Sequence, residues 1–119
     1  MLAKHPRLRL YVMHAGYPLI DDMLALMYAY RQVHVDTGGI VYTQPRADFY
    51  ATLKRIIDAG FGKRVMFGSD QMDRPETIGR SIRIIEEDPD LTPEQKCDIL
   101  HDKAARFLRL DHPASARTT

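Results

Sequence analysis

The chain has a single cysteine, Cys97, and no tryptophan. One thiol cannot form an internal disulfide, and it cannot supply a cysteine-rich metal site. The charged neighbours of Cys97 place it at the surface or edge of a helix, without a partner that would make it a nucleophile. Because a lone reduced thiol is typical of the cytoplasm, we expect a cytoplasmic protein.

The sequence also lacks a large net charge and any long apolar run. The formal net charge is +1, which gives no electrostatic reason to expect nucleic acid or an anionic membrane as a partner. The apolar stretches are far shorter than a membrane span, and residues 1–6 show no signal-peptide core. What remains is an ordinary globular composition of 119 residues, 45% hydrophobic and 28% charged, which is enough for one small domain.

Short apolar stretches predict three strands, and helical spacing predicts four helices between and after them. The predicted strands cover residues 7–13, 33–36 and 64–67. The first two helices are predicted over 19–31 and 46–59, the third opens at 73–76 with Asp73 as its cap, and the fourth opens with a capping box at 92–95. Residues 37–45 are predicted to form a loop, and residues 111–119 a disordered tail after a domain spanning 1–110.

Strands that alternate with helices in this way are typical of βαβ units, a parallel sheet and right-handed crossovers. We therefore predict an α/β fold. Three strands leave unpaired backbone groups on both outer edges of the sheet. The chain is thus expected to associate with itself or a partner through these open edges, or to form part of a larger sheet or barrel.

Polar residues follow each predicted strand and would meet at one edge of the sheet. His14 follows the first strand, on the period-two face of Leu8, Leu10 and Val12, and Asp70 follows the third. Two strand spacings separate them by about 10 Å, and barrel curvature would bring their tips closer. A histidine and an aspartate suit metal coordination with proton transfer, although a catalytic metal usually needs about three protein ligands. Asp70 is otherwise a turn former or helix cap.

Other polar residues are weaker candidates. His34 lies inside its strand and is expected to be structural, while Asp36 is expected at most to support other site groups. Ser69 has no histidine at a spacing that would activate it, and the Gly38–Gly39 pair matches no phosphate-binding pattern. The remaining histidines lie outside the predicted site, at His5, His101 and His112.

Four segments in order, residues 13–16, 67–70, 91–96 and 104–110, together resemble the C-terminal part of an amidohydrolase-related protein. This resemblance covers residues 2–110 and implies a partial TIM-type (β/α)8 barrel, with the last three parallel βα units and a C-terminal helix. It implies that His14 is the strand-six base or hydrogen-bonding group. It also implies that Asp70 is the strand-eight aspartate that approaches a divalent metal, zinc or manganese, and moves a proton of the attacking water.

The chain departs from the family pattern at two places. The His-x-His pair of the first barrel strand and the strand-five histidine are absent, and Lys103 stands where relatives usually have asparagine. We therefore expect a C-terminal fragment that is inactive alone and binds metal only when the other ligands are supplied. The resemblance implies a small-molecule substrate, with Tyr17, Gln71 and Arg74 as rim contacts.

The resemblance leaves three functions open. The chain can belong to a metal-dependent hydrolase that activates water, or to a metal-dependent decarboxylase of an aromatic or unsaturated carboxylic acid. It can also be a non-catalytic α/β fragment or a partner-dependent module.

Overall fold

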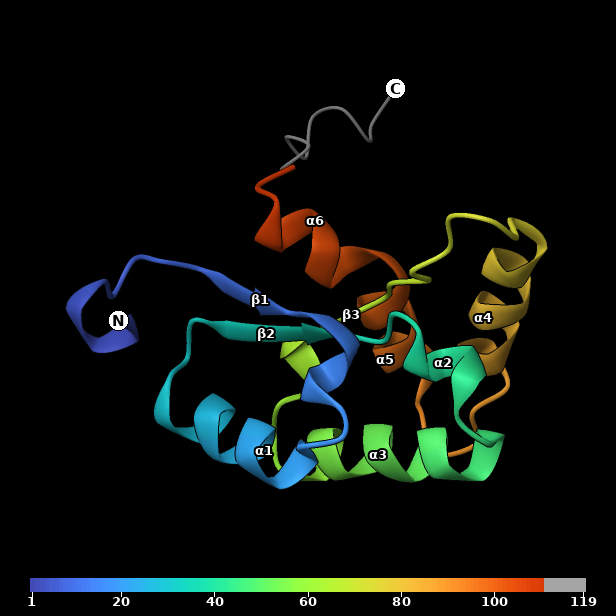
Figure 1. Cartoon of the computed structure of the whole chain (residues 1–119), viewed down its shortest axis with the longest axis horizontal. Helices are drawn as coiled ribbons and strands as arrows, with labels where there is room; N and C mark the ends of the chain where they lie inside the picture. Colours follow the sequence, from blue (N-terminus) through green and yellow to red (C-terminus); the bar gives the residue numbers. More distant parts are fainter. Residues whose placement is uncertain (111–119) are drawn as a thin grey trace.

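The computed structural model describes residues 1–110, in which three parallel strands form one sheet (Figure 1). The strands are β1 (Leu10–Val12), β2 (Val33–Asp36) and β3 (Val65–Met66), and they lie side by side in chain order. Both neighbouring pairs are parallel, as the βαβ pattern predicts. The predicted tail at 111–119 lies outside the described residues.

The helices follow the predicted order, with several differences at their ends. In chain order they are η1 (Leu2–Lys4), η2 (Met13–Gly16), α1 (Ile20–Ala29), α2 (Ile40–Thr43), α3 (Arg46–Asp58), η3 (Gly62–Arg64), α4 (Glu76–Glu86), α5 (Pro93–Cys97), the π-helical segment η4 (Asp98–Asp102) and α6 (Lys103–Phe107).

Helix α2 occupies part of the segment that was predicted to be a loop. Gly39 precedes it with a φ of 70°, and the Val41 N–H donates to the Thr37 carbonyl at 3.1 Å. The left-handed glycine reverses the chain directly into a helical turn. A turn of four residues is too short to show the apolar periodicity from which helices are predicted.

The third helix begins later than predicted. Pro75 is the residue before α4, no side chain caps the helix, and Asp73 lies outside it, so the predicted Asp73 cap is wrong. The buried face of α4 carries Ser81, Ile84 and Ile85, while Ile78 in the first turn is exposed. Backbone carbonyls replace a capping side chain here, because the Thr77 N–H donates to the Arg74 carbonyl at 3.0 Å and the Ile78 N–H to the Pro75 carbonyl at 3.1 Å.

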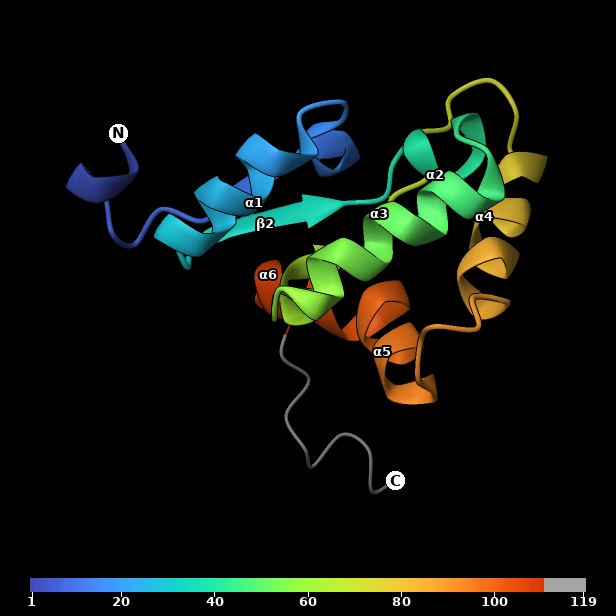
Figure 2. The same ribbon diagram turned by 90° about the horizontal axis from the view of Figure 1, so that it is seen from below.

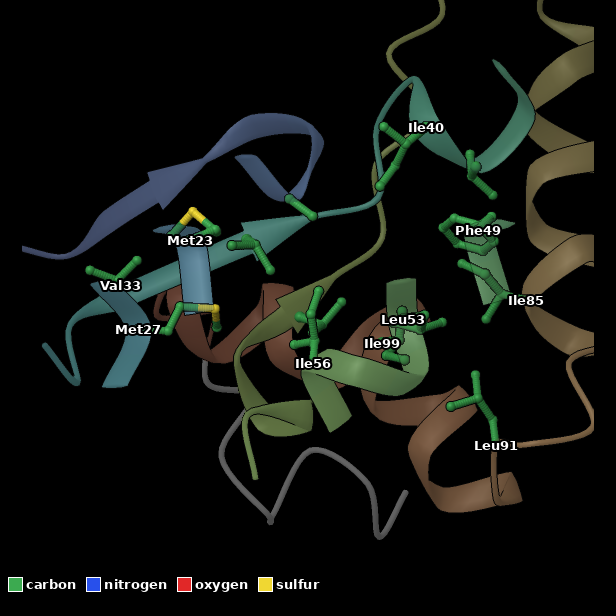
Figure 3. Packing of buried hydrophobic residues seen from close by; sticks show 14 of the residues in the cluster. Met23, Met27, Val33, Ile40, Phe49, Leu53, Ile56, Ile85, Leu91 and Ile99 are labelled. Carbon is green, nitrogen blue, oxygen red and sulfur yellow. The ribbon is translucent and has the colours of Figure 1, made fainter. Parts of the chain in front are cut away.

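One face of the sheet packs against α1 and α3, which lie together on the same side of the strands (Figures 1 and 2). Val33, Val35 and Val65 are buried on this face. They belong to one hydrophobic core that also contains Met27 of α1 and Phe49 of α3 (Figure 3). Burial of these side chains accounts for most of the stabilisation of the βαβ units, since each contributes about 1.5–3 kcal/mol.

The opposite face of the sheet carries Tyr11, His34 and Asp36, and α6 lies over it (Figure 1). The Phe107 ring of α6 lies 5.0 Å from the His34 ring and 6.0 Å from the Tyr11 ring, measured between centroids. Met66 pairs with Asp36 and is buried beside this helix. The C-terminal helix thus covers the sheet face that α1 and α3 leave open.

The final helix begins as predicted and is then interrupted. Thr92 and Gln95 form the predicted capping box in both directions. Residues 98–102 then adopt a π-helical turn, which the apolar pattern does not predict. In this turn the Lys103 N–H donates to the Asp98 carbonyl, and the buried Lys103 ammonium pairs with the Asp98 carboxylate at 2.9 Å. The five-residue spacing of this pair matches the π-helical repeat.

We expect Asp98→Ala to lower the free energy of unfolding by about 3 kcal/mol, because it leaves the buried Lys103 charge without a partner. Asp58→Ala is the matched control, since it removes a carboxylate from the exposed Lys54–Asp58 pair. The control should change stability by less than about 0.5 kcal/mol. Urea unfolding of both variants measures the difference, and equal losses would contradict a buried ionic role for Lys103.

Two further predictions bear on the surface of this fold. Within residues 1–110, no helix has both the length and the apolar character needed to cross a bilayer. Among residues 1–110, the outer strands β1 and β3 each pair with β2 alone. Association of the chain through these two edges stays a prediction.

Candidate active site at the carboxyl ends of the strands

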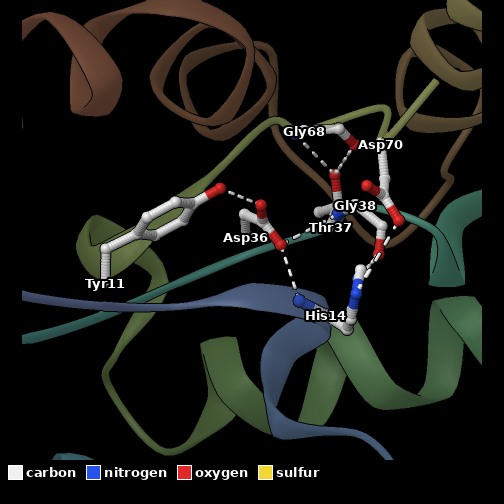
Figure 4. A network of polar contacts seen from close by, with 7 residues as sticks. All are labelled: Tyr11, His14, Asp36, Thr37, Gly38, Gly68 and Asp70. Atoms are coloured by element: carbon white, nitrogen blue, oxygen red, sulfur yellow. Dashed lines mark hydrogen bonds and ion pairs between the residues drawn. The ribbon is translucent and has the colours of Figure 1, made fainter. Parts of the chain in front are cut away.

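His14 and Asp70 meet at the carboxyl ends of β1 and β3 (Figure 4). The His14 Nε2 atom lies 3.7 Å from an Asp70 carboxylate oxygen, and the two side chains are 39% and 42% exposed. The sequence predicted that these two side chains converge, and the structure brings them together. Their side chains are within reach of solvent, so a small molecule can approach both.

The backbone at this edge is unusual at both residues. His14 has a φ of 60° and Ala15 a φ of 50°, while Asp70 has a φ of 53°. Left-handed conformations of non-glycine residues cost roughly 1–3 kcal/mol and gather at functional sites. Strand β1 ends at Val12, so the left-handed turn, and not the alternation of the strand, aims His14. The period-two pattern from which the face of His14 was predicted therefore does not extend to His14, because the strand ends two residues earlier.

The His14 ring is held by a carbonyl group. Its Nδ1 atom lies 2.6 Å from the Gly38 carbonyl oxygen. Since a carbonyl oxygen only accepts hydrogen bonds, this contact assigns the proton of the neutral ring to Nδ1. The Nε2 atom, which faces Asp70, then has a free lone pair that can accept a proton or bind a metal.

Asp36 is buried next to this pair and accepts three hydrogen bonds. One carboxylate oxygen accepts from the backbone N–H of His14 at 2.7 Å and of Gly38 at 3.0 Å, and the other accepts from the Tyr11 hydroxyl. The Asp36 residue is only 3% exposed. The sequence ranked Asp36 as a supporting group and did not single out Tyr11. Period-two alternation and parallel register place Tyr11 beside His34 on the Asp36 face, which is the signal that could have found it.

Burial raises the pKa of the Tyr11 phenol, and its hydrogen bond to Asp36 raises it further. Ionising Tyr11 would place a second negative charge beside the buried Asp36 carboxylate. Tyr11 therefore remains a neutral hydrogen-bond donor to Asp36 at physiological pH.

Small residues on the neighbouring loops let these groups approach one another. A Cβ atom on Gly68 would lie 2.7 Å from the nearer Asp36 oxygen, and one on Gly39 would lie 3.2 Å from His14 Nδ1. Thr37 ties the second and third strand ends together, because its hydroxyl donates to the Gly68 carbonyl and accepts from the Gly68 N–H. The Gly38–Gly39 turn thus serves close packing around His14 and Asp36.

His34 lies away from the site edge and has the structural role that the sequence predicts for it. Its ring packs edge-on against Phe107. Burial lowers the pKa of His34, and the nearby Arg64 and Arg9 charges lower it further.

We expect this histidine to make the fold less stable in acid. Because the pKa of His34 is lowered on folding, its contribution is complete above the ordinary histidine pKa of about 6.5 and is lost as pH falls toward its folded value. Thermal unfolding of the wild type and His34→Phe, at neutral pH and at about pH 5, measures the effect. The wild type should lose more stability between the two pH values than the variant, and equal losses would contradict the assignment.

Other predicted residues lie outside this cluster. Cys97 and His101 are exposed on the C-terminal helix, where His101 contacts Asp102. Tyr17 lines a separate open depression of about 630 Å³ together with Asp48 and Arg55. Substrate contacts from Tyr17 and from the predicted rim residues Gln71 and Arg74 stay predictions.

The donor atoms at this edge suit a divalent metal in kind but not in number. Imidazole nitrogen and carboxylate oxygen are ordinary ligands of zinc and manganese. Within residues 1–110, however, no three His, Cys, Asp or Glu side chains are grouped closely enough to hold a metal ion. His14 and Asp70 could therefore contribute to a metal site whose other ligands come from elsewhere.

Comparison with known proteins gives the family and the fold of the chain. No curated protein matches the chain. Among solved structures, an uncharacterized TIM-barrel protein from Bordetella bronchiseptica superposes with a TM-score of 0.66 at 19% identity, over 91% of this chain and 36% of that chain. The predicted partial barrel is thus confirmed, and the chain spans little more than a third of that barrel protein. The amidohydrolase family model matches residues 1–110, so the chain belongs to the amidohydrolase family, as the sequence resemblance predicts.

Proposed function

We propose that this chain supplies the catalytic edge of a metal-dependent hydrolase that activates water for attack on a small organic substrate. The observation that carries the proposal is the His14–Asp70 pair, in which a ring nitrogen with a free lone pair faces a carboxylate at 3.7 Å. The pair lies at the carboxyl ends of parallel strands, which is the edge where TIM barrels carry their active sites. Membership of the amidohydrolase family supports the same chemistry.

A divalent metal, when bound, supplies a water whose pKa is lowered toward neutrality and polarises the substrate. Asp70 is proposed to contribute a ligand oxygen and to accept a proton at its exposed carboxylate. The Nε2 atom of His14 is proposed to accept a hydrogen bond or a proton from the reacting group. The half-exposed positions of both side chains allow these roles, because each can reach substrate from the solvent side.

The site is proposed to be completed by the other βα units of a barrel. Asp70 alone falls short of the roughly three protein ligands that a catalytic zinc needs. In a closed barrel the free edges of β1 and β3 would each pair with a further strand, which would carry the remaining ligands to the same edge. The chain alone is accordingly expected to be inactive.

The test is hydrolysis of an activated ester, such as 4-nitrophenyl acetate, by the chain joined to the other βα units of a family barrel. The proposal predicts a rate that disappears with a chelator and returns with zinc or manganese. A panel of aromatic carboxylic acids is included, because carbon dioxide release from these acids would identify a decarboxylase. If the completed protein shows neither reaction with either metal, the catalytic proposal is wrong and the chain is a non-catalytic module.

A further inference from the structure

The buried carboxylate of Asp36 has a position that the proposed chemistry does not use. Asp36 is 3% exposed, and no ion pair to it is present among residues 1–110. Its hydrogen-bond donors are neutral: two backbone N–H groups and the Tyr11 hydroxyl. Burying a charge without a cation is costly unless several hydrogen bonds satisfy it. This buried carboxylate is in direct contact with the backbone of His14.

The geometry of the two backbone donors connects Asp36 to the His14 ring (Figure 4). The same Asp36 oxygen accepts from His14 N–H at 2.7 Å and from Gly38 N–H at 3.0 Å. His14 and Gly38 are also the partners of the ring contact, in which Nδ1 lies 2.6 Å from the Gly38 carbonyl oxygen. One carboxylate oxygen thus holds the backbone on both sides of the hydrogen bond that orients the ring.

We propose that Asp36 is a positioning residue that fixes the tautomer and aim of the His14 imidazole. The hydrogen bond that the His14 N–H donates to Asp36 supports the left-handed conformation of His14, with its φ of 60°. The hydrogen bond that the Gly38 N–H donates to Asp36 places the Gly38 carbonyl, which accepts the hydrogen bond from Nδ1. With the proton held on Nδ1, Nε2 stays open toward Asp70.

Asp36 is itself held in place from the other side. Tyr11 donates to the second Asp36 oxygen, and Gly68 leaves room for that oxygen because a Cβ there would lie 2.7 Å away. The Tyr11 hydroxyl bonds the other oxygen and not the one that accepts from His14 and Gly38. Removal of the Tyr11 hydroxyl should therefore leave the His14 ring unchanged, which provides a matched control.

The role given to Nε2 in this inference rests on the proposed function, but the experiment measures only which nitrogen of the His14 ring carries the proton. The experiment is nitrogen-15 NMR of the histidine rings in the full chain at about pH 8, where an ordinary histidine is neutral. His14→Asn identifies the His14 signals by their loss. The wild type should show His14 protonated at Nδ1 and unprotonated at Nε2.

Asp36→Ala is expected to convert most of the His14 population away from the Nδ1-protonated form, because both backbone bonds lose their acceptor. Asp36→Asn should restore the wild-type signals, since its amide oxygen can accept both N–H groups while its NH₂ faces Tyr11. Tyr11→Phe should leave the His14 signals in place. If Asp36→Ala does not fold, Gly68→Ala replaces it, because its Cβ displaces the Asp36 carboxylate without removing it.

A folded Asp36→Ala or Gly68→Ala variant that keeps the Nδ1-protonated signals would overturn the proposal, and would leave Asp36 with a structural role only. A folded Asp36→Asn variant that loses those signals would overturn it as well. Failure of the proposed function has a different signature: the completed barrel would lack metal-dependent turnover while the tautomer still depends on Asp36.

Discussion

Replacing Asp70 with asparagine is expected to lower the metal-dependent rate of the completed barrel about a thousandfold, since a positioned proton-transfer group contributes roughly 10²–10⁴-fold. Asparagine keeps the size of the side chain and tolerates the left-handed backbone that Asp70 adopts, with its φ of 53°. The loss then reports the carboxylate charge and not a distorted loop. Initial rates at saturating zinc measure it.

His14→Asn provides the companion measurement and should lower the same rate about a hundredfold or more. The double variant should be only slightly slower than Asp70→Asn, because groups that act as a unit do not add. Asp73→Ala removes an exposed carboxylate three residues beyond Asp70 and serves as the control, with an unchanged rate. A wild-type rate in Asp70→Asn would show that the carboxylate at the end of β3 takes no part in catalysis.

Replacing Arg64 with alanine is expected to lower the free energy of unfolding by about 3 kcal/mol, because hydrogen bonds from charged groups are worth roughly 1.5–3 kcal/mol each and are not additive. The Arg64 guanidinium donates to the carbonyls of Met27 at 2.7 Å, Tyr30 at 2.9 Å and Val33 at 3.2 Å. It also lies 4.4 Å from the centre of the Phe61 ring. Arg64 therefore connects the end of α1 and the start of β2 to the segment that leads into β3.

Two variants separate the planar hydrogen-bonding geometry of the Arg64 guanidinium from its positive charge. Arg64→Lys keeps a positive charge near the end of α1 but cannot reach three carbonyls in one plane, so we expect about half of the loss. Lys63→Ala changes the exposed neighbour and should alter stability by less than about 0.5 kcal/mol. Urea unfolding compares the three variants. A loss in Arg64→Ala as small as that in Lys63→Ala would refute this bridging role.

The order of the strands and helices and the extent of β2 could be predicted, but the lengths of the two outer strands could not. Alternation in residues 7–13 predicts a long first strand, yet β1 covers only Leu10–Val12. Its partner β2 has four residues, Val33–Asp36, and a strand extends only as far as its neighbour offers backbone groups to pair with. Strand β3 is shortened to Val65–Met66 because Arg64 belongs to η3 and Phe67 lies beyond the last residue of β2, Asp36.

The sequence predicts which strand ends meet at the site, but it does not predict how the His14 side chain is oriented there. Parallel topology brings the segments of His14 and Asp70 to one edge, which their positions after two predicted strands already indicate. The aim of His14 depends on a left-handed turn and on hydrogen bonds to Asp36 and Gly38. Both arise from tertiary contacts between residues more than 20 positions apart, which period-two alternation does not describe.

Metal stoichiometry tests the central claim most directly. Elemental analysis after zinc loading and desalting should find no stoichiometric metal on the chain alone, because its described residues bring together only part of a ligand set. The chain completed with the other βα units should retain zinc, and Asp70→Asn in the same protein should retain less. Stoichiometric zinc on the chain alone, or undiminished zinc in the completed Asp70→Asn variant, would contradict the account of a shared site with Asp70 as a ligand.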